Sequence, residues 1–360
     1  MSAAAAPRPI RKPPLPLVRT PRRARSALTI IGALGGLTVA AAAHAAGCIM
    51  QQAGELQVTM HGTRPLVHAG INGKDALFLA DTGASYSTLN SSVAKDFRLD
   101  LEPAPAWFAE SGVAGEAHTM ITRAKIFSIF GANIPGIDFV VVDRATEPGL
   151  TGMLGQNVFR LGDIEFDLAR SVIRLLRTHD CGRNDGLAYW AAGESKPFSV
   201  IDIDAQTRES PQIHGDAYIN GVKVRVLFDT GAARSFVTLK AAERVGVTPS
   251  SPGTTVEGRF LGIGGRGGDE WIAPFASFKI GDEEIRNTRL RIGDLKLSDT
   301  DMILGADFFL SHHVLVATSQ RKLYFTYNGG KVFDLSSLTP PASAAPLPAA
   351  PPGAEQAAAH

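Results

Sequence analysis

The tetrapeptide Asp-Thr-Gly-Ala occurs twice in this chain of 360 residues, at positions 81–84 and again at positions 229–232. Each copy ends an apolar run, and each run follows an Ile-Asn-Gly turn whose asparagine lies nine residues before the aspartate. Alignment of residues 69–84 with residues 217–232 gives nine identities in 16 positions. A repeat this long indicates a duplicated lobe, because solenoids repeat roughly every 20–50 residues.

An apolar pair followed by glycine also repeats, at positions 153–155 and 303–305. The two glycines lie 74 and 76 residues after the aspartate of their own half. We expect each apolar strand to pass behind its Asp loop and to continue into a helical turn, over residues 156–159 and 306–309. One acid from each of two related lobes can do acid–base chemistry that neither carboxylate could do alone.

Many short apolar runs and few helical patterns predict a mostly β protein. Asn-Gly pairs between apolar runs predict tight hairpins, because both residue types tolerate positive φ. The predicted strands span residues 56–60, 65–71 and 74–80 in the first half and 198–203, 213–219 and 222–228 in the second. A short helix is predicted at 90–99 and another at 239–245, the second capped by Thr238 and ended by Gly246.

The charge pattern separates a basic leader from an acidic body. Residues 1–54 hold seven basic residues and no acid, so the formal charge of +1 for the whole chain becomes −6 for the remainder. An acidic body gives no electrostatic reason to expect a nucleic-acid partner. The basic residues at 22–25, the uncharged stretch at 26–47 and the small-x-small pattern at 43–45 predict a signal peptide over residues 1–47. A retained membrane anchor is the alternative.

Two cysteines, Cys48 and Cys181, follow the predicted cleavage site, which favours a disulfide in an exported protein. It would close a loop of 133 residues (48 to 181), worth about 4–5 kcal/mol in the chain-entropy model. Lipidation of Cys48 is the alternative, because residues 45–48 resemble a bacterial lipobox. We expect a periplasmic or secreted protein, with a membrane partner only if the leader is retained or Cys48 is lipidated.

These motifs resemble those of the retropepsin-like aspartic peptidases, of the bacterial exported type, in a single-chain form that holds both halves. The resemblance covers roughly residues 55–180 and 198–330. It implies an all-β bilobal acid-protease fold with few short helices, made of two pseudo-twofold-related β-barrel lobes. We expect an N-terminal lobe at 48–182, a linker at 183–197, a C-terminal lobe at 198–335 and a disordered Pro/Ala-rich tail at 336–360.

The resemblance also implies that Asp81 and Asp229 are the catalytic pair. Two carboxyls about 3 Å apart cannot both be ionised, so they share a proton and activate a water between them. Pepsin-like enzymes often carry Ser after Asp-Thr-Gly, whereas this chain has Ala84 and Ala232. Fewer hydrogen-bond donors to the charged form predict activity at mildly acid pH.

Two further sets of residues receive roles from the resemblance. Thr82 and Thr230 would brace the two loops through hydroxyl-to-backbone hydrogen bonds, and a glycine in each motif would let backbone N–H groups approach the carboxylates; these glycines are Gly83 and Gly231. Substrate flaps would have glycine-rich hairpin tips, at Gly112, Val113, Ala114 and Gly115 and at Gly262, Ile263, Gly264 and Gly265.

The function expected from these residues is that of an aspartic endopeptidase that acts on a peptide or protein substrate, as a monomer and without a cofactor. A catalytically silent peptide-binding protein on the same fold is the alternative, and a two-carboxylate glycosidase gives no reason for Thr-Gly after both acids. No His/Cys cluster has zinc spacing, so we expect no metal site. We expect His179 and the pair His312-His313 to be solvated or in hairpins.

Overall fold

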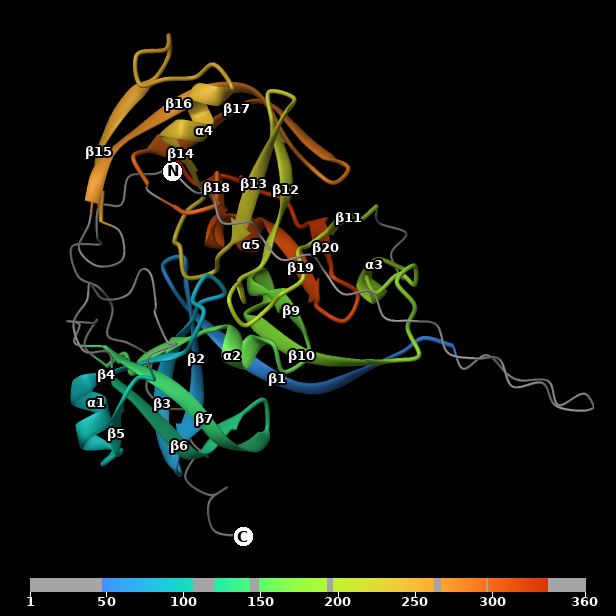
Figure 1. Cartoon of the computed structure of the whole chain (residues 1–360). Helices are drawn as coiled ribbons and strands as arrows, with labels where there is room; N and C mark the ends of the chain where they lie inside the picture. The colour runs from blue at the N-terminus through green and yellow to red at the C-terminus, as the bar shows by residue number, and fades with distance from the viewer. Residues whose placement is uncertain are drawn as a thin grey trace, which may run out of the picture. The chain divides into compact units, whose positions relative to one another are not determined.

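The computed structural model describes residues 47–105, 120–142, 149–192, 197–261, 267–295 and 297–335 (Figure 1). The predicted signal peptide up to residue 46, both flap tips and the Pro/Ala-rich tail lie outside these residues. Most of the described residues are in strands, and the few helices are one or two turns long. The strands form two barrels and a sheet that joins them, which confirms the all-β, two-lobed fold.

The N-terminal barrel has six strands in the order β2-β3-β8-β4-β7-β6, closed by pairing of β2 with β6. A short seventh strand, β5, adds to β6 outside the barrel. The pairs β3–β8 and β4–β7 are parallel, and the others are antiparallel. The bounds are β2 (Arg64–Ile71), β3 (Lys74–Ala80), β4 (Thr88–Asn90), β5 (Leu101–Pro103), β6 (Met120–Ile129), β7 (Ala132–Val142) and β8 (Gly152–Leu154).

The C-terminal barrel repeats this topology strand for strand, in the order β12-β13-β18-β14-β17-β16 with β12 paired to β16. Again β13–β18 and β14–β17 are the parallel pairs, and β15 adds to β16. The duplication inferred from the motifs therefore extends to the whole barrel. The bounds are β12 (His214–Ile219), β13 (Val222–Phe228), β14 (Phe236–Thr238), β15 (Thr255–Leu261), β16 (Gly267–Ile280), β17 (Glu283–Gly293) and β18 (Met302–Leu304).

The hairpins and helices follow local chemistry. In both Asn-Gly turns the two residues have positive φ, 51° and 82° at Asn72-Gly73 and 50° and 77° at Asn220-Gly221, as a two-residue hairpin requires. The helix α4 (Leu239–Arg244) begins after Thr238, whose hydroxyl accepts from the Ala241 N–H at 3.2 Å. The helix predicted at 90–99 is shorter, α1 (Ser91–Asp96). The two predicted helical turns form as α2 (Gln156–Phe159) and α5 (Ala306–Ser311).

Strands from both halves build an antiparallel sheet between the barrels, in the order β11-β20-β19-β9-β10-β1 (Figure 1). The halves meet where β9 pairs with β19, and β1 continues into pairing with β2. A 3-10 turn, η1 (Leu168–Arg170), and a short helix, α3 (Tyr189–Ala192), follow β9 and β10. The bounds are β1 (Ile49–His61), β9 (Asp163–Asp167), β10 (Val172–His179), β11 (Ser199–Asp202), β19 (His312–Ala317) and β20 (Lys322–Tyr327).

Aromatic side chains fill the interior of both lobes. In the N-terminal barrel Phe78 stacks on Phe139 at 6.0 Å between ring centroids, and Phe127 meets Phe139 edge-on at 5.4 Å. Between the halves Phe166 on β9 meets Phe309 on α5 edge-on at 5.4 Å. One buried apolar cluster includes side chains of both barrels and of the central sheet, so packing couples the halves.

The predicted disulfide between Cys48 and Cys181 is present, and it joins the start of β1 to the chain just beyond β10. The Cys48 sulfur is thus bonded to Cys181, whereas a lipid on Cys48 would have to be attached to that same sulfur. Among the described residues, no helix is long and apolar enough to cross a membrane.

The paired histidines lie in the β19–β20 hairpin, one of the two settings expected for them, but they are not solvated. His179 is exposed, but His312 and His313 are buried, at 0% and 3% exposure. Each has a carboxylate beside it: His312 Nε2 lies 3.0 Å from Glu283 Oε2, and His313 Nε2 lies 3.0 Å from Glu165 Oε1. Polar groups are buried where they find partners, and those partners come from distant strands that the local sequence does not reveal.

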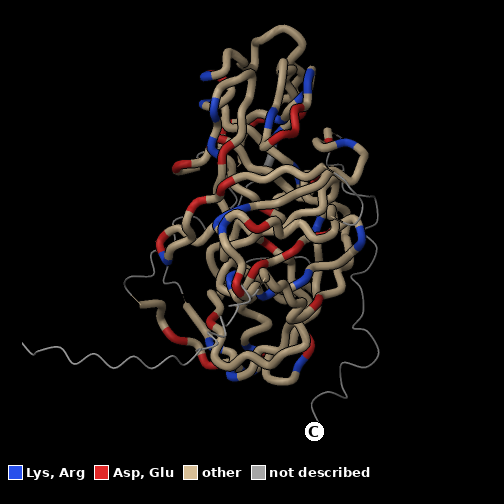
Figure 2. The backbone as a smooth tube through the Cα atoms, turned by 90° about the vertical axis from the view of Figure 1, so that its right-hand side faces the viewer, with Lys and Arg blue, Asp and Glu red and all other residues tan. Residues whose placement is uncertain are grey.

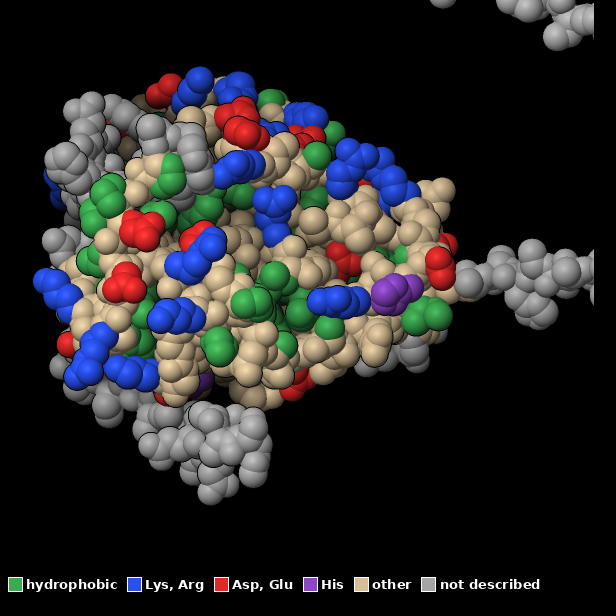
Figure 3. Space-filling view, turned by 60° about the horizontal axis from the view of Figure 1, so that its bottom comes forward, with side chains coloured by type: hydrophobic (Ala, Val, Ile, Leu, Met, Phe, Trp, Pro, Cys, Tyr) green, Lys and Arg blue, Asp and Glu red, His purple; other side chains and the backbone are tan. Residues whose placement is uncertain are grey.

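Acidic and basic residues are interspersed along the backbone (Figure 2). Several make cross-strand ion pairs on the barrels, such as Arg123 Nε with Asp138 Oδ1 at 2.6 Å and Lys223 Nζ with Asp216 Oδ2 at 2.7 Å. On the face in Figure 3, hydrophobic side chains likewise lie between charged ones. Exposed pairs of this kind add little stability, about 0–1 kcal/mol each.

Candidate active site

Both Asp-Thr-Gly loops begin where a barrel strand ends. Asp81 follows β3, and its N–H donates to Leu154 O on β8 at 2.9 Å. Asp229 follows β13, and its N–H donates to Leu304 O on β18 at 2.9 Å. Because β3–β8 and β13–β18 are parallel pairs, each Gly-ending strand runs directly beside its Asp strand.

The glycine that follows each of these strands passes behind the Asp loop at a distance that no side chain would allow. A Cβ on Gly155 would lie 2.8 Å from Ala84 O, and one on Gly305 would lie 2.8 Å from Ala232 O. The following residue then hydrogen-bonds the same carbonyl, from Gln156 N to Ala84 O at 2.9 Å in the first half. The second half has the equivalent bond to Ala232 O at 2.8 Å.

A buried polar brace behind each loop was missed by the sequence reasoning. Ser87 donates its hydroxyl and its N–H to Asn157 Oδ1 at 2.8 and 2.7 Å. In the second half Ser235 donates its hydroxyl to Asp307 Oδ1 at 2.7 Å. The signal was present as a serine six residues after each aspartate, matched by a polar residue two positions after each glycine.

The two threonines connect the loops to each other. Thr82 Oγ1 donates to Phe228 O at 2.8 Å and accepts from Thr230 N at 2.9 Å. Thr230 Oγ1 donates to Ala80 O at 2.8 Å, and Thr82 N donates to it at 3.1 Å. All four bonds cross from one half to the other. Both threonines are buried, with 0% and 1% exposure.

The structure brings both aspartates into contact with the opposite loop. A Cβ built on Gly83 would lie 2.6 Å from Asp229 Oδ1, and one built on Gly231 would lie 2.5 Å from Asp81 Oδ1. These distances are shorter than real Cβ contacts, so only glycine lets each carboxyl pass this close to the other backbone. Each carboxyl also accepts N–H bonds from its own loop, for example from Gly83 to Asp81 Oδ1 at 3.0 Å.

Burial and mutual repulsion change the acidity of the pair. Burial raises the pKa of Asp81 well above its ordinary value, and the charge of Asp229 and a hydrogen bond with it raise the pKa further. Burial also raises the pKa of Asp229, while hydrogen bonds from Asp81 and from the N–H groups of Ala232, Gly231 and Gly83 act in the opposite direction. The pair therefore keeps one shared proton at a pH where a solvated carboxyl has lost it.

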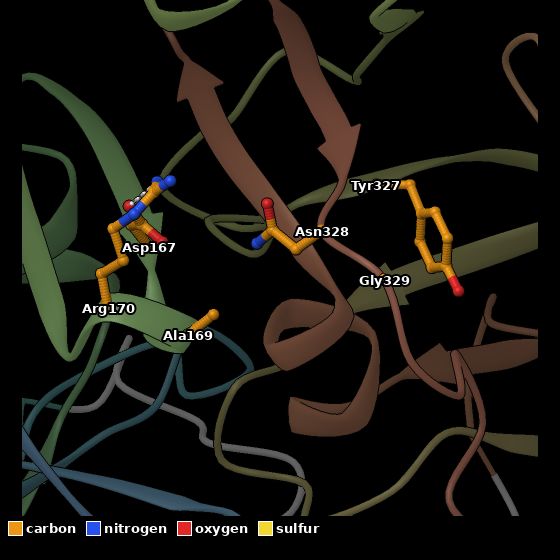
Figure 4. Close-up of a pocket in the computed structure, with 6 residues that line it drawn as sticks. All are labelled: Asp167, Ala169, Arg170, Tyr327, Asn328 and Gly329. Atoms are coloured by element: carbon orange, nitrogen blue, oxygen red, sulfur yellow. Dashed lines mark hydrogen bonds and ion pairs between the residues drawn. The ribbon is translucent and has the colours of Figure 1, made fainter.

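A separate cavity of about 500 Å³ lies where η1 meets the end of β20 (Figure 4). Asn328 points toward the ion pair between Asp167 and Arg170, while the Tyr327 ring points away from it. Neither aspartate of the pair lines this cavity.

Two pairs of antiparallel strands flank the predicted flap tips. They are β5 with β6 in the first half and β15 with β16 in the second.

A family model described as aspartyl protease matches the chain twice, at residues 67–158 and 216–308. Each match runs from the first barrel strand to the helix behind the Asp loop, and the two together span more than half of the chain. The chain therefore belongs to the aspartyl protease family.

Two solved structures are similar to the chain. The aspartic proteinase from Irpex lacteus is 13% identical, with a TM-score of 0.47 over 76% of this chain and 97% of that chain. The retropepsin-like aspartic protease from Rickettsia conorii is 18% identical, with a TM-score of 0.27 over 36% of this chain and 91% of that chain. No curated protein matches the chain.

Proposed function

We propose that this protein is an aspartic endopeptidase in which Asp81 and Asp229 activate a water that attacks a peptide bond. The observation that carries the proposal is the pair of buried carboxyls, each packed against the glycine of the opposite Asp-Thr-Gly loop. Membership of the aspartyl protease family supports it. Because one chain supplies both loops, we expect the monomer to be active.

In this mechanism Asp229 is ionised and takes a proton from the bound water as its oxygen attacks the carbonyl carbon of the substrate. Asp81 donates its proton to the carbonyl oxygen, which gives a neutral gem-diol. The gem-diol then collapses: the C–N bond breaks, the leaving nitrogen takes the proton from Asp229, and a hydroxyl returns a proton to Asp81. Both carboxyls end in their starting states.

The test is to incubate the mature protein with a diverse peptide library at several pH values and to sequence the products. We expect endopeptidase cuts at mildly acid pH, inhibition by pepstatin-type compounds, and loss of cleavage in Asp81→Asn and in Asp229→Asn separately. Asp216→Asn, at an exposed carboxylate of a surface ion pair, is the matched control and should cleave as the wild type does. Binding of peptides without any cut would show a silent peptide-binding protein instead.

We also propose that residues 1–47 are a signal peptide and that the mature protein works outside the cytoplasm, in the periplasm or secreted. The disulfide supports an oxidising compartment, since such bonds are rare where thiols are kept reduced. Mass spectrometry of the protein recovered from its host should find an N-terminus close to Cys48. Recovery of the intact leader, or of a lipid on Cys48, would refute cleavage as proposed.

A further inference from the structure

The helix behind the Asp81 loop carries a glutamine that the two halves do not share. Gln156 is 1% exposed, and its side-chain Nε2 donates to Thr82 O at 2.6 Å. Its own N–H donates to Ala84 O at 2.9 Å. The equivalent residue in the second half is Ala306, which makes the same backbone bond to Ala232 O but has no side-chain donor. The loops around the two aspartates are therefore braced differently.

The carbonyl that Gln156 binds belongs to the peptide group whose N–H faces the carboxyl pair. This peptide joins Thr82 to Gly83, and the Gly83 N–H donates to Asp81 Oδ1 at 3.0 Å. The same N–H favours the ionised form of Asp229. Hydrogen bonds in a chain polarise one another, so a donor on the carbonyl of this peptide strengthens its N–H as a donor to the carboxylates.

A second glutamine orients the first. Gln206, in the segment between β11 and β12, donates from Nε2 to Gln156 Oε1 at 3.1 Å and to Pro211 O at 2.6 Å. Its own Oε1 accepts from Thr318 Oγ1, in the turn between β19 and β20, at 3.2 Å. With its oxygen occupied as an acceptor, the Gln156 amide must present its NH₂ group to the Asp81 loop.

We propose that Gln156 is a positioning residue that polarises the Thr82–Gly83 peptide toward the aspartate pair, and that Gln206 holds its amide in the donating orientation. The inference rests on the proposed peptidase function of this site. It predicts that Gln156 lowers the pH at which the pair ionises, because a stronger N–H donor stabilises the carboxylate forms.

The experiment compares Gln156→Met with Gln212→Met. Gln212 is the matched control, because its amide also makes one hydrogen bond to the Asp81 loop, to Ser85 Oγ at 2.6 Å, but it does not touch the Thr82–Gly83 peptide. The first readout is the titration of the aspartate carboxyls by ¹³C NMR, which requires no peptidase activity. The second is the pH dependence of kcat and KM.

In Gln156→Met we expect the carboxyl titration and the acid limb of kcat to move up by about half a pH unit. We also expect kcat to fall about three- to tenfold, with KM little changed. Gln206→Leu should shift the carboxyl titration and the acid limb of kcat in the same direction, but less than Gln156→Met does. If Gln156→Met does not fold, Gln206→Leu is the variant that tests the inference. Gln212→Met should leave both pH dependences in place.

Unshifted titration in the Gln156 and Gln206 variants, even with a lowered Tm, would overturn the inference, since a purely structural brace changes stability alone. An equal shift in Gln212→Met would overturn it as well. A wild-type protein that cuts no peptide would refute the proposed function, whereas the NMR titration would still decide the role of Gln156.

Discussion

At the residue scale, Thr82 and Thr230 show how two distant parts of the chain come to share one structure. Each hydroxyl donates to a carbonyl of the opposite half and accepts an N–H from that half. The four groups lie in the buried centre, where a polar group without a partner costs about 1–3 kcal/mol. The brace works only when both halves are folded and docked.

Removal of one hydroxyl tests this brace. Thr82→Val keeps the shape of the side chain but leaves Phe228 O and Thr230 N without their partner. We expect the free energy of unfolding to fall by about 2–4 kcal/mol, measured by urea denaturation. Thr59→Val, at an exposed position on β1, should change it by less than about 0.5 kcal/mol. Equal effects of the two substitutions would contradict the prediction.

Asp307 provides a pH test, because its counterpart in the first half is the neutral Asn157. Burial raises the pKa of Asp307 above its ordinary value, although hydrogen bonds from Ser235 oppose the rise. The folded protein therefore keeps this proton when the unfolded chain has released it. The stabilisation is complete below about pH 4, the ordinary value, and is lost as the pH rises through the folded-state pKa.

Asp307→Asn removes this dependence while keeping the oxygen that accepts from Ser235. We expect its free energy of unfolding, measured against pH from 3 to 8, to fall less steeply with rising pH than that of the wild type. The variant also loses the hydrogen bond that the Asp334 N–H donates to Asp307 Oδ2. This loss should lower its free energy of unfolding by the same amount at every pH. Curves that stay parallel over the whole range would show that Asp307 titrates normally.

At the scale of elements, the parts that local pattern determines could be predicted. Asn-Gly hairpins and the Thr238 cap depend on backbone angles and on near neighbours, and they form where expected. The Gly-ending strands could be placed because they repeat at a matching distance from each aspartate. The disulfide followed from the cysteine count.

The central sheet could not be predicted, because its pairings join residues far apart in the chain, as in Val314 with Phe166. No local periodicity encodes such a partner. The burial of His312 and His313 could not be predicted for the same reason, since their partners Glu283 and Glu165 are remote in sequence. Gln156 looked like an ordinary helix start, and its role depends on a carbonyl 74 residues away.

The disulfide joins two strand ends that already pair, since Ile49 lies opposite His179 in the β1–β10 ladder. Its stabilisation therefore acts mainly on the unfolded chain, where it closes a loop of 133 residues. In the Cys48→Ser/Cys181→Ser variant we expect the free energy of unfolding to fall by about 4 kcal/mol, measured by urea denaturation. A reductant should lower the free energy of unfolding of the wild type by the same amount as the two substitutions do, and it should not affect the variant. A variant whose urea midpoint equals that of the oxidised wild type would refute this.

At the scale of the whole molecule, a buried charge network ties together the halves and the segment between them. Glu165 on β9 is 0% exposed and bonds with Arg174 on β10. It also meets His313 on β19 at 3.0 Å and Tyr189 on α3 at 2.6 Å. Burial would raise the pKa of Glu165, but the hydrogen bonds with His313 and Tyr189 hold it below its ordinary value.

Glu165→Gln should destabilise the protein, because it removes the buried carboxylate beside His313 and leaves Arg174 paired with Glu55 alone. We expect a loss of about 3 kcal/mol at pH 7. Because the pKa is lowered, the wild-type contribution is present above pH 4–5, the ordinary range, and is lost as the pH falls through the folded-state value. The variant should thus approach the wild type in acid. Glu284→Gln, at an exposed surface pair, should change the free energy of unfolding at any pH by no more than about a third of the loss expected for Glu165→Gln at pH 7.

The single-chain design has a consequence for how a ligand can lie across the molecule. A homodimer that binds a peptide between its subunits has two identical sides to its binding site. A polypeptide has a direction, and it therefore fits such a site equally well in either of two reversed poses. Here the residues that brace the two Asp loops from behind already differ, since Gln156 corresponds to Ala306 and Asn157 to Asp307. Because the two halves of this chain are related but not identical, we expect a peptide bound between them to lie with one polarity only.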